Sequence, residues 1–297
     1  MPSDNPRSIL SPVDFSEQSQ DALRWAAALA ARFGSRLTVV SVVDPLLAEA
    51  ARVRLNQDLA KQETEPALRE FAAATWASAT PATTQIVFRT VVGDAAGSIL
   101  ETAEGEGADL IVMGTQGLGG FRKWLLGSTT ERLLRRTKVP VLAIPRADES
   151  ETREADSVSH ILAATDFSAS SIAAARIAAH WARAFSAKLT LTHIVEPVSV
   201  PPQWLPLVEE SDETRVGTAR AKLHALAEQI CGSPKCDEVV ALGRTADLIG
   251  STAVDRRARL IVMGLAGEQG AFSPRPGSIA YRVLSSTTVP VLVVPAS

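Results

Sequence analysis

Short apolar runs alternate with longer amphipathic stretches along the whole chain. In the first half the apolar runs lie at residues 8–13, 36–43, 84–92, 108–113 and 141–144. They are rich in Val, Ile and Leu, as is typical of strands covered on both faces of a parallel sheet. Helical spacing of apolar residues marks the stretches between them, with helices expected at 17–33, within 48–79, and at 95–104 and 128–136. The pattern predicts an α/β fold with a parallel sheet covered by helices.

The second half of the chain repeats the first. Asp14-Phe15-Ser16 recurs as Asp166-Phe167-Ser168, and residues 93–145 align without a gap with 243–295, with 23 identities in 53 positions. The polar, charged interval 147–157 lacks apolar periodicity, which is typical of a linker. We therefore predict two tandem domains, at residues 1–146 and 158–297, and a length of 297 residues suits two cores.

A glycine loop follows the fourth predicted strand of each half. Nine residues separate Gly117, the second glycine of Gly114-Thr115-Gln116-Gly117, from Gly127-Ser128, and the second half has the same spacing at Gly264, Gly267 and Gly277-Ser278. Glycines allow a close approach of the backbone to a ligand, and a helix start offers N–H groups to phosphate oxygens. In open α/β sheets such ligands bind beyond the carboxyl ends of the strands, where the strand order switches. The loop predicts a phosphate site.

Two common nucleotide motifs do not fit this loop. Neither copy has the Gly-x4-Gly-Lys-Ser/Thr of a P-loop. The glycines of a Rossmann fingerprint follow the first strand of a unit, whereas these follow the fourth. The pattern is therefore typical neither of P-loop NTPases nor of dinucleotide-dependent dehydrogenases.

Helix capping offers a second explanation for several of these residues. Ser128 and Glu131 have the spacing of a capping box, which stabilises a helix start without a ligand. Asp14 or Ser16 could each cap the helix that follows the first strand. Since Ser16 alone would suffice, we favour a ligand contact for Asp14.

The composition and charge of the chain argue against several classes of protein. The net charge of −3 argues against a protein that coats nucleic acid, and no apolar run is long enough to predict a membrane span. The first residues lack the pattern of a signal peptide, so we expect a cytoplasmic protein. The two cysteines, Cys231 and Cys236, have no further ligand to complete a metal site, and we expect ordinary thiols in a reducing compartment.

The motifs together resemble the universal stress protein family. The resemblance is carried by the glycine loop after Leu110-Ile-Val-Met113, by Val13-Asp14-Phe15-Ser16, by Val42-Val43-Asp44-Pro45 and by the closing run 139–145. Because it covers both halves, the chain resembles a tandem member. The resemblance implies two doubly wound domains, each with a five-stranded parallel sheet of order 3-2-1-4-5.

The resemblance also implies ATP binding and the residues for it. Those implied in the first half are Pro12, Val13, Asp14 and Val42 at the base, and Met113, Gly114, Gly117, Gly127, Ser128, Thr129 and Thr130 around the ribose and phosphates. Their counterparts are Ala164, Thr165, Asp166, Ile194, Met263, Gly264, Gly267, Gly277, Ser278 and Ile279. Mg²⁺ or Mn²⁺ is expected through the phosphates, with no protein side chain as a metal ligand.

The two predicted sites differ at their phosphate ends. Thr129 and Thr130 are replaced by Ile279 and Ala280, which removes two hydroxyl donors. Prolines at 274 and 276 also restrict the second loop. We therefore expect the first site to bind ATP more tightly than the second.

The function expected from these features is a cytoplasmic, ATP-binding regulator of the stress response. The alternatives are a scaffold that binds an unknown protein partner with little use for nucleotide, and a slow ATPase. The four histidines lie outside both glycine loops, and His193 falls in a predicted strand as a structural residue, so we expect at most weak hydrolysis. The resemblance further suggests that the halves form an intrachain pseudo-dimer, while homodimer formation is open.

Overall fold

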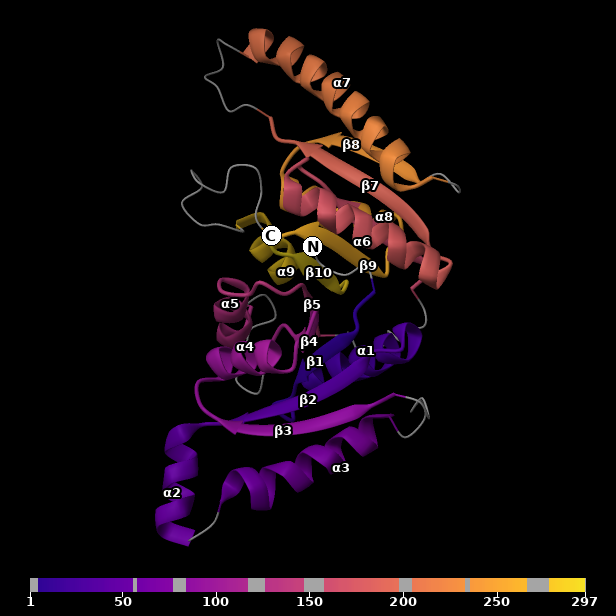
Figure 1. The fold of residues 1–297 in the computed structure, drawn as a ribbon. Helices are drawn as coiled ribbons and strands as arrows, with labels where there is room; N and C mark the ends of the chain where they lie inside the picture. Colours follow the sequence, from indigo (N-terminus) through magenta and orange to yellow (C-terminus); the bar gives the residue numbers. More distant parts are fainter. Residues whose placement is uncertain are drawn as a thin grey trace. The chain divides into compact units, whose positions relative to one another are not determined.

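The chain forms two compact units, one within residues 1–157 and one at Val158–Ala296 (Figure 1). The computed structural model describes residues 5–55, 58–76, 84–116, 126–146, 158–197, 205–232, 236–265 and 278–296. The linker predicted at 147–157 lies outside the described residues. The exact domain limits therefore stay a prediction.

The first unit alternates strands and helices as its apolar pattern predicts. Its elements are β1 (Ser8–Pro12), α1 (Glu17–Phe33), β2 (Arg36–Val43), α2 (Pro45–Leu55), the π-helical segment η1 (Leu59–Thr64), α3 (Glu65–Trp76), β3 (Ile86–Val92), α4 (Ala95–Gly105), β4 (Leu110–Gly114), α5 (Ser128–Leu134) and β5 (Val141–Ile144). Strand β1 pairs with β2 and β4, β3 pairs with β2, and β5 pairs with β4, all in parallel. The resulting order is 3-2-1-4-5, with the switch point between β1 and β4.

The second unit repeats this arrangement. Its elements are β6 (His160–Ala164), α6 (Ala169–Phe185), β7 (Lys188–Val195), α7 (Leu205–Ile230), β8 (Asp237–Leu242), α8 (Thr245–Asp255), β9 (Leu260–Gly264), α9 (Ser278–Ser286) and β10 (Val291–Val294). Strand β6 pairs in parallel with β7 and β9, β8 with β7, and β10 with β9. Within this unit the order is therefore β8-β7-β6-β9-β10.

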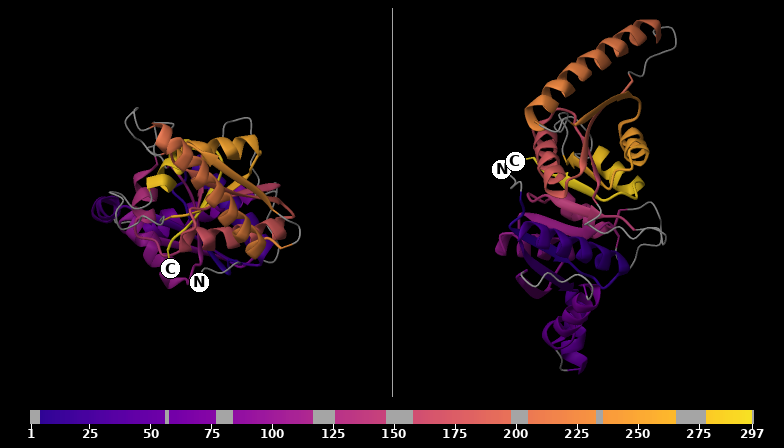
Figure 2. Two further views of the ribbon diagram at one scale, coloured as in Figure 1. Left: turned by 90° about the horizontal axis from the view of Figure 1, so that it is seen from above. Right: turned by 90° about the vertical axis from the view of Figure 1, so that its right-hand side faces the viewer.

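Helices cover both faces of each sheet, which explains why the strands are so apolar. In the first unit α1 packs against α3 and the strands, and α4 packs against α5; α3 lies beside β3, just as α7 lies beside β8 in the second unit (Figures 1 and 2). Ile9 and Leu10 of β1 and Ile161 and Leu162 of β6 have no exposed surface. Burial of these side chains is the main favourable contribution to each fold.

The helical stretch expected within 48–79 is divided in the first unit: α2 ends at Leu55, and the π-helical η1 then runs directly into α3, which ends at Trp76. Helix α2 starts at Pro45, where the N–H groups of Leu46 and Leu47 donate to Asp44 Oδ1 at 2.8 and 3.2 Å. Pro66 is the second residue of α3, directly after η1. Proline suits the first turn of an α-helix, where its missing N–H would have no intrahelical partner.

The expectation of two free thiols is wrong. Cys231 and Cys236 form a disulfide, with their Cα atoms 5.9 Å apart. Cys231 follows the end of α7 and Cys236 precedes β8, so the reversal of the chain between helix and strand brings the two residues together. The distance lies in the ordinary range for disulfides.

Candidate functional site

The turn after β1 presents a carboxylate beyond the edge of the sheet. Ser16 is the N-cap of α1, and its Oγ accepts a hydrogen bond from Ser19 N at 3.2 Å. Asp14 Oδ1 accepts from the N and the Oγ of Ser16 at 3.1 and 2.6 Å. Ser16 therefore caps the helix, while the exposed Asp14 stiffens the cap and places its carboxylate beside it.

The turn after β6 has the same geometry. Asp166 Oδ1 accepts from the N and the Oγ of Ser168 at 3.1 and 2.6 Å. In both turns the intervening phenylalanine has a left-handed backbone, with φ of 65° at Phe15 and 66° at Phe167. That conformation costs a residue other than glycine on the order of 1 kcal/mol or more. The two turns therefore share the same backbone conformation and the same carboxylate–serine hydrogen bonds.

Close packing of a helix on a strand explains the first glycine of each loop. A Cβ at Gly114 would lie 3.0 Å from Gln18 Cβ and 3.2 Å from the Gln18 carbonyl carbon. A Cβ at Gly264 would lie 2.7 Å from Ser170 Oγ and 2.9 Å from Ser171 N. These two glycines are thus required by the approach of α1 and α6, whatever else they do. The same approach brings the Asp14 turn next to the end of β4.

The start of α5 is tied to the end of β4 by main-chain hydrogen bonds. Gly127 N donates to Thr115 O at 2.8 Å, and the first bond within the helix runs from Glu131 N to Gly127 O at 2.9 Å. The N–H groups of residues 128–130 therefore precede the first intrahelical bond, as at any helix start. These amides lie at the end of β4 where the sequence predicts phosphate.

The predicted capping box is wrong. Gly127, with an extended backbone, is the N-cap of α5, and the cap has no side-chain hydrogen bond. Ser128 is already inside the helix, one position too late to cap it. Glu131 instead pairs with Arg135 at 2.6 Å, one turn along the same helix. Helix capping consequently leaves the side chain of Ser128 unexplained.

The three hydroxyl residues of α5 have different surroundings. Thr130 is 2% exposed, and its Oγ1 donates to Gly114 O at 3.1 Å. Ser128 is exposed and Thr129 is half-buried. The hydroxyl of Thr130 thus links α5 to β4, and its predicted role as a phosphate donor lacks support. Replacement by the buried Ala280 in the second unit removes this link rather than a surface donor.

The other predicted residues lie around the same strand ends. Val13 and Met113 are buried, and Pro12 and Val42 are half-buried. In the second unit Ala164 is in register with Met263 of β9 and Thr192 of β7, while Thr165 and Ile194 are buried. Gly117, Gly267 and Gly277 lie outside the described residues. Ser278 opens α9, but its side chain is not among those described.

An aromatic cluster that the sequence analysis missed lies beside the second turn. His193 Nδ1 donates to Thr165 O at 2.7 Å, and the imidazole lies 4.5 Å from the ring of Phe167. Lys222 Nζ lies 5.7 Å from the centre of the same ring. In the first unit Phe15 contacts Phe71 edge-on at 5.5 Å. The half-buried His193 thus makes both a hydrogen bond and an aromatic contact to the second turn.

Charged groups near the two loop helices are also arranged differently. Arg132 of α5 pairs at 2.9 Å with Asp94, whose side chain caps α4. In the second unit Glu196 Oε1 accepts from Thr245 N at 3.2 Å, at the start of α8. Hydrogen bonds from Thr245, followed by the charge of Arg282, hold the pKa of the Glu196 carboxyl below its usual value. Each loop helix therefore has an arginine near a carboxylate, but the carboxylates come from different elements.

The described residues offer neither a membrane span nor a metal site. None of their helices is both long and apolar enough to cross a bilayer. Across the same ranges, no three His, Cys, Asp or Glu side chains gather in a way that could hold a metal ion. The chemistry that these residues offer at the strand ends is carboxylate acceptors, main-chain amides and hydroxyls.

Comparisons with known proteins agree with the fold and with the repeat. The model of the Universal stress protein family matches residues 6–145 and again 157–295. A universal stress protein of Mycolicibacterium smegmatis is 28% identical over 304 residues, covering 96% of each chain. A shorter one from Thermus aquaticus is 36% identical over 136 residues, which are 45% of this chain and 96% of its own.

A solved structure shows the same fold across both halves. The universal stress protein from Archaeoglobus fulgidus superposes with a TM-score of 0.68 at 20% identity, covering 98% of this chain and 99% of its own. The family model covers nearly all of the chain in two consecutive matches. The chain therefore belongs to the universal stress protein family, with one copy of the family's domain in each half.

Proposed function

We propose that the protein binds ATP at the switch point of each sheet and that nucleotide occupancy serves a regulatory role in the stress response. The observation that carries this proposal is the convergence of three segments at the end of β4. The Asp14 turn reaches it through the packing of Gln18 on Gly114, and α5 reaches it through the bonds of Gly127 and Thr130. An acceptor suited to an amine and donors suited to phosphate are thus carried by segments that pack at the end of the same strand, which supports the proposal.

The donor set of the first site suits an adenine nucleotide. The carboxylate of Asp14 can accept from the exocyclic amine of the base, and the main chain at Val42 can complete recognition of its edge. The N–H groups at the start of α5 and the outer hydroxyls of Ser128 and Thr129 suit phosphate oxygens. A divalent cation would be held chiefly by the phosphates and water.

The first site is proposed to be the tighter one. Thr129 supplies a hydroxyl where the second site has the aliphatic Ile279. Main-chain amides are unaffected by this replacement, so the second site is expected to bind with lower affinity rather than to lose binding.

The direct test is binding of ATP to the full chain, with GTP as competitor. Asp14→Asn and Asp166→Asn in one chain keep an oxygen for the serine caps but place amide hydrogens near the amine. We expect this double variant to lose at least about tenfold in affinity, the equivalent of one hydrogen bond. Asp21→Asn, a matched change at a carboxylate that pairs with Arg24 on α1, should leave affinity unchanged. Equal binding of GTP, or full affinity in the double variant, would refute the proposal.

A further inference from the structure

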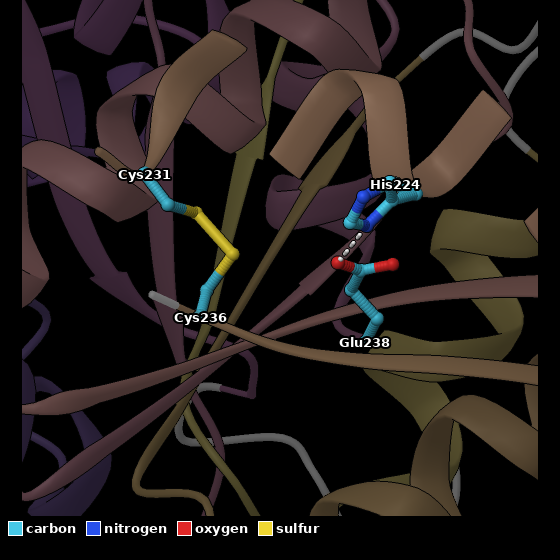
Figure 3. Close-up of a disulfide and its surroundings, with 4 residues drawn as sticks. All are labelled: His224, Cys231, Cys236 and Glu238. Carbon is cyan, nitrogen blue, oxygen red and sulfur yellow. Dashed lines mark hydrogen bonds and ion pairs between the residues drawn. A yellow bond between two sulfur atoms is a disulfide. The ribbon is translucent and has the colours of Figure 1, made fainter. Parts of the chain in front are cut away.

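The disulfide of the second unit lies beside a second link between the same helix and strand. Cys231 and Cys236 join the end of α7 to the start of β8, and His224 Nδ1 of α7 lies 2.9 Å from Glu238 Oε1 of β8 (Figure 3). Leu223, Leu226 and Ala227 of α7 are buried. The helix is therefore held against its sheet by apolar packing and by a polar contact as well as by the disulfide.

The disulfide is not required for this fold. Both cysteines lie in the second half, and the first unit reaches the same strand order without any cysteine. The bond spans only five positions of sequence. Closing so short a loop removes much less freedom from the unfolded chain than a bond across a whole domain would. A purely stabilising role therefore explains the pair poorly.

We propose that Cys231 and Cys236 form a reversible dithiol–disulfide site that is oxidised by hydroperoxides and reduced by dithiols. The two residues differ in access, because Cys231 is 7% exposed whereas Cys236 is only half-buried. Cys236 also precedes β8, the edge strand of its sheet, which pairs with β7 on one side. A reagent from solvent therefore meets the sulfur of Cys236 first, and Cys231 acts as the resolving thiol.

The chemistry balances with one peroxide for each disulfide. The thiolate of Cys236 attacks one oxygen of the hydroperoxide, the O–O bond breaks, and a sulfenic acid forms as the alcohol or water leaves. The thiolate of Cys231 then attacks the sulfenic sulfur, the S–S bond forms, and hydroxide leaves and is protonated to water. Two electrons pass from the two sulfurs to the peroxide. An added dithiol returns them by exchange at Cys236 and becomes a disulfide itself.

The structural effect of reduction should be local. Loss of the S–S bond frees the last turn of α7 from the first residues of β8, while the buried leucines and the contact between His224 and Glu238 persist. Amide exchange is therefore expected to rise at the end of α7 and the start of β8. The first unit, which has no cysteine, provides an internal control.

The test uses the full chain in native buffer. Dithiothreitol should add the mass of two hydrogen atoms with the fold retained, and one equivalent of hydrogen peroxide should restore the disulfide. After peroxide, Cys231→Ser should be labelled by a diketone probe for sulfenic acid, because Cys236 then lacks its resolving thiol. The matched variant Cys236→Ser should be labelled at least tenfold more slowly. Reduction only in denaturant, equal labelling of the two variants, or no oxidation by peroxide would each overturn the proposal.

Discussion

The two domains share a fold and the same sequence motifs, yet different side chains form the hydrogen bonds to corresponding backbone carbonyl groups. In the first domain Ser8 Oγ and the Arg36 guanidinium both donate to the carbonyl oxygen of Glu106. In the second, His160 Nδ1 donates at 2.7 Å to Arg256 O, the corresponding carbonyl. The repeated motifs therefore determine the common backbone fold, while residues outside the motifs determine which hydrogen bonds stabilise each domain.

The same comparison extends to a pair of threonines. Thr190 Oγ1 lies 2.8 Å from His160 Nε2, whereas Thr38 Oγ1, its counterpart, is buried without a hydrogen-bond partner among the described residues. A buried hydroxyl without a partner costs about 1 to 3 kcal/mol. His160, which stands where the first domain has Ser8, thus gives the buried hydroxyl of Thr190 a hydrogen-bond partner, but it also buries a titratable ring.

The largest difference in stability between the two domains is expected when the first glycine of each loop is replaced by alanine. In Gly264→Ala the new methyl group would collide with backbone atoms of α6, and we expect a loss of about 3 kcal/mol in the free energy of unfolding. Gly114→Ala meets longer contacts at Gln18, and we expect a loss of about 1 kcal/mol. Urea unfolding of the full chain measures both. Equal losses, or a greater loss in Gly114→Ala, would contradict this account of the helix–strand approach.

An effect of intermediate size is expected from removing the hydroxyl groups of Thr129 and Thr130 in α5. Thr130→Val keeps the shape of the side chain but removes its bond to Gly114 O, so the free energy of unfolding should fall by about 1 kcal/mol with ATP affinity unchanged. Thr129→Val should do the reverse, lowering ATP affinity with a change in stability under about 0.5 kcal/mol. Unfolding and binding assays on both variants check the pair. The same change in stability and in ATP affinity in both variants would contradict the different roles assigned to Thr129 and Thr130.

The smallest effect concerns pH. Burial is the main cause that lowers the pKa of His160 from its usual value near 6.5. The folded pKa therefore lies below the unfolded one, and the unfolded state binds more protons between them. The stability of the second domain should be full above about pH 6.5 and should fall as the pH drops through that window.

His160→Ser copies the first domain and supplies the control for this pH dependence. The variant lacks the titrating ring, so its unfolding free energy should vary less than that of the wild type between pH 7.5 and 5.5, about the range over which histidine titrates. Urea unfolding at several pH values measures both slopes. An unchanged slope in the variant would exclude His160 as the source.

Sequence patterns predicted the strands and the repeat because parallel strands buried on both faces leave continuous apolar runs, whereas the strand order was implied only by the family resemblance. The first residue of α5, Ser128, was predicted, but its N-cap was not, since Gly127 and Ser128 are both acceptable caps and the choice depends on the bond between Gly127 and Thr115. The contact of His193 with Thr165 could not have been predicted, because it joins a strand to a turn 28 positions away.

The glycines of the two loops also show that sequence alone does not separate a structural cause from a functional one. Their spacing indicated a ligand, but at Gly114 and Gly264 the close approach of a helix already requires glycine. A pattern kept in two copies therefore has a structural cause as well as the proposed functional one. Substitutions of exposed residues, such as Asp14 and Ser128, are therefore the ones that separate the functional cause from the structural one.

Titration of the full chain with magnesium ATP, together with the single variants Asp14→Asn and Asp166→Asn, tests the central claim most directly. The account predicts two binding steps in the wild type. Asp14→Asn should weaken the tighter step and leave the weaker one, and Asp166→Asn should do the opposite. A single step, or loss of the tighter step in Asp166→Asn with Asp14→Asn unaffected, would contradict it.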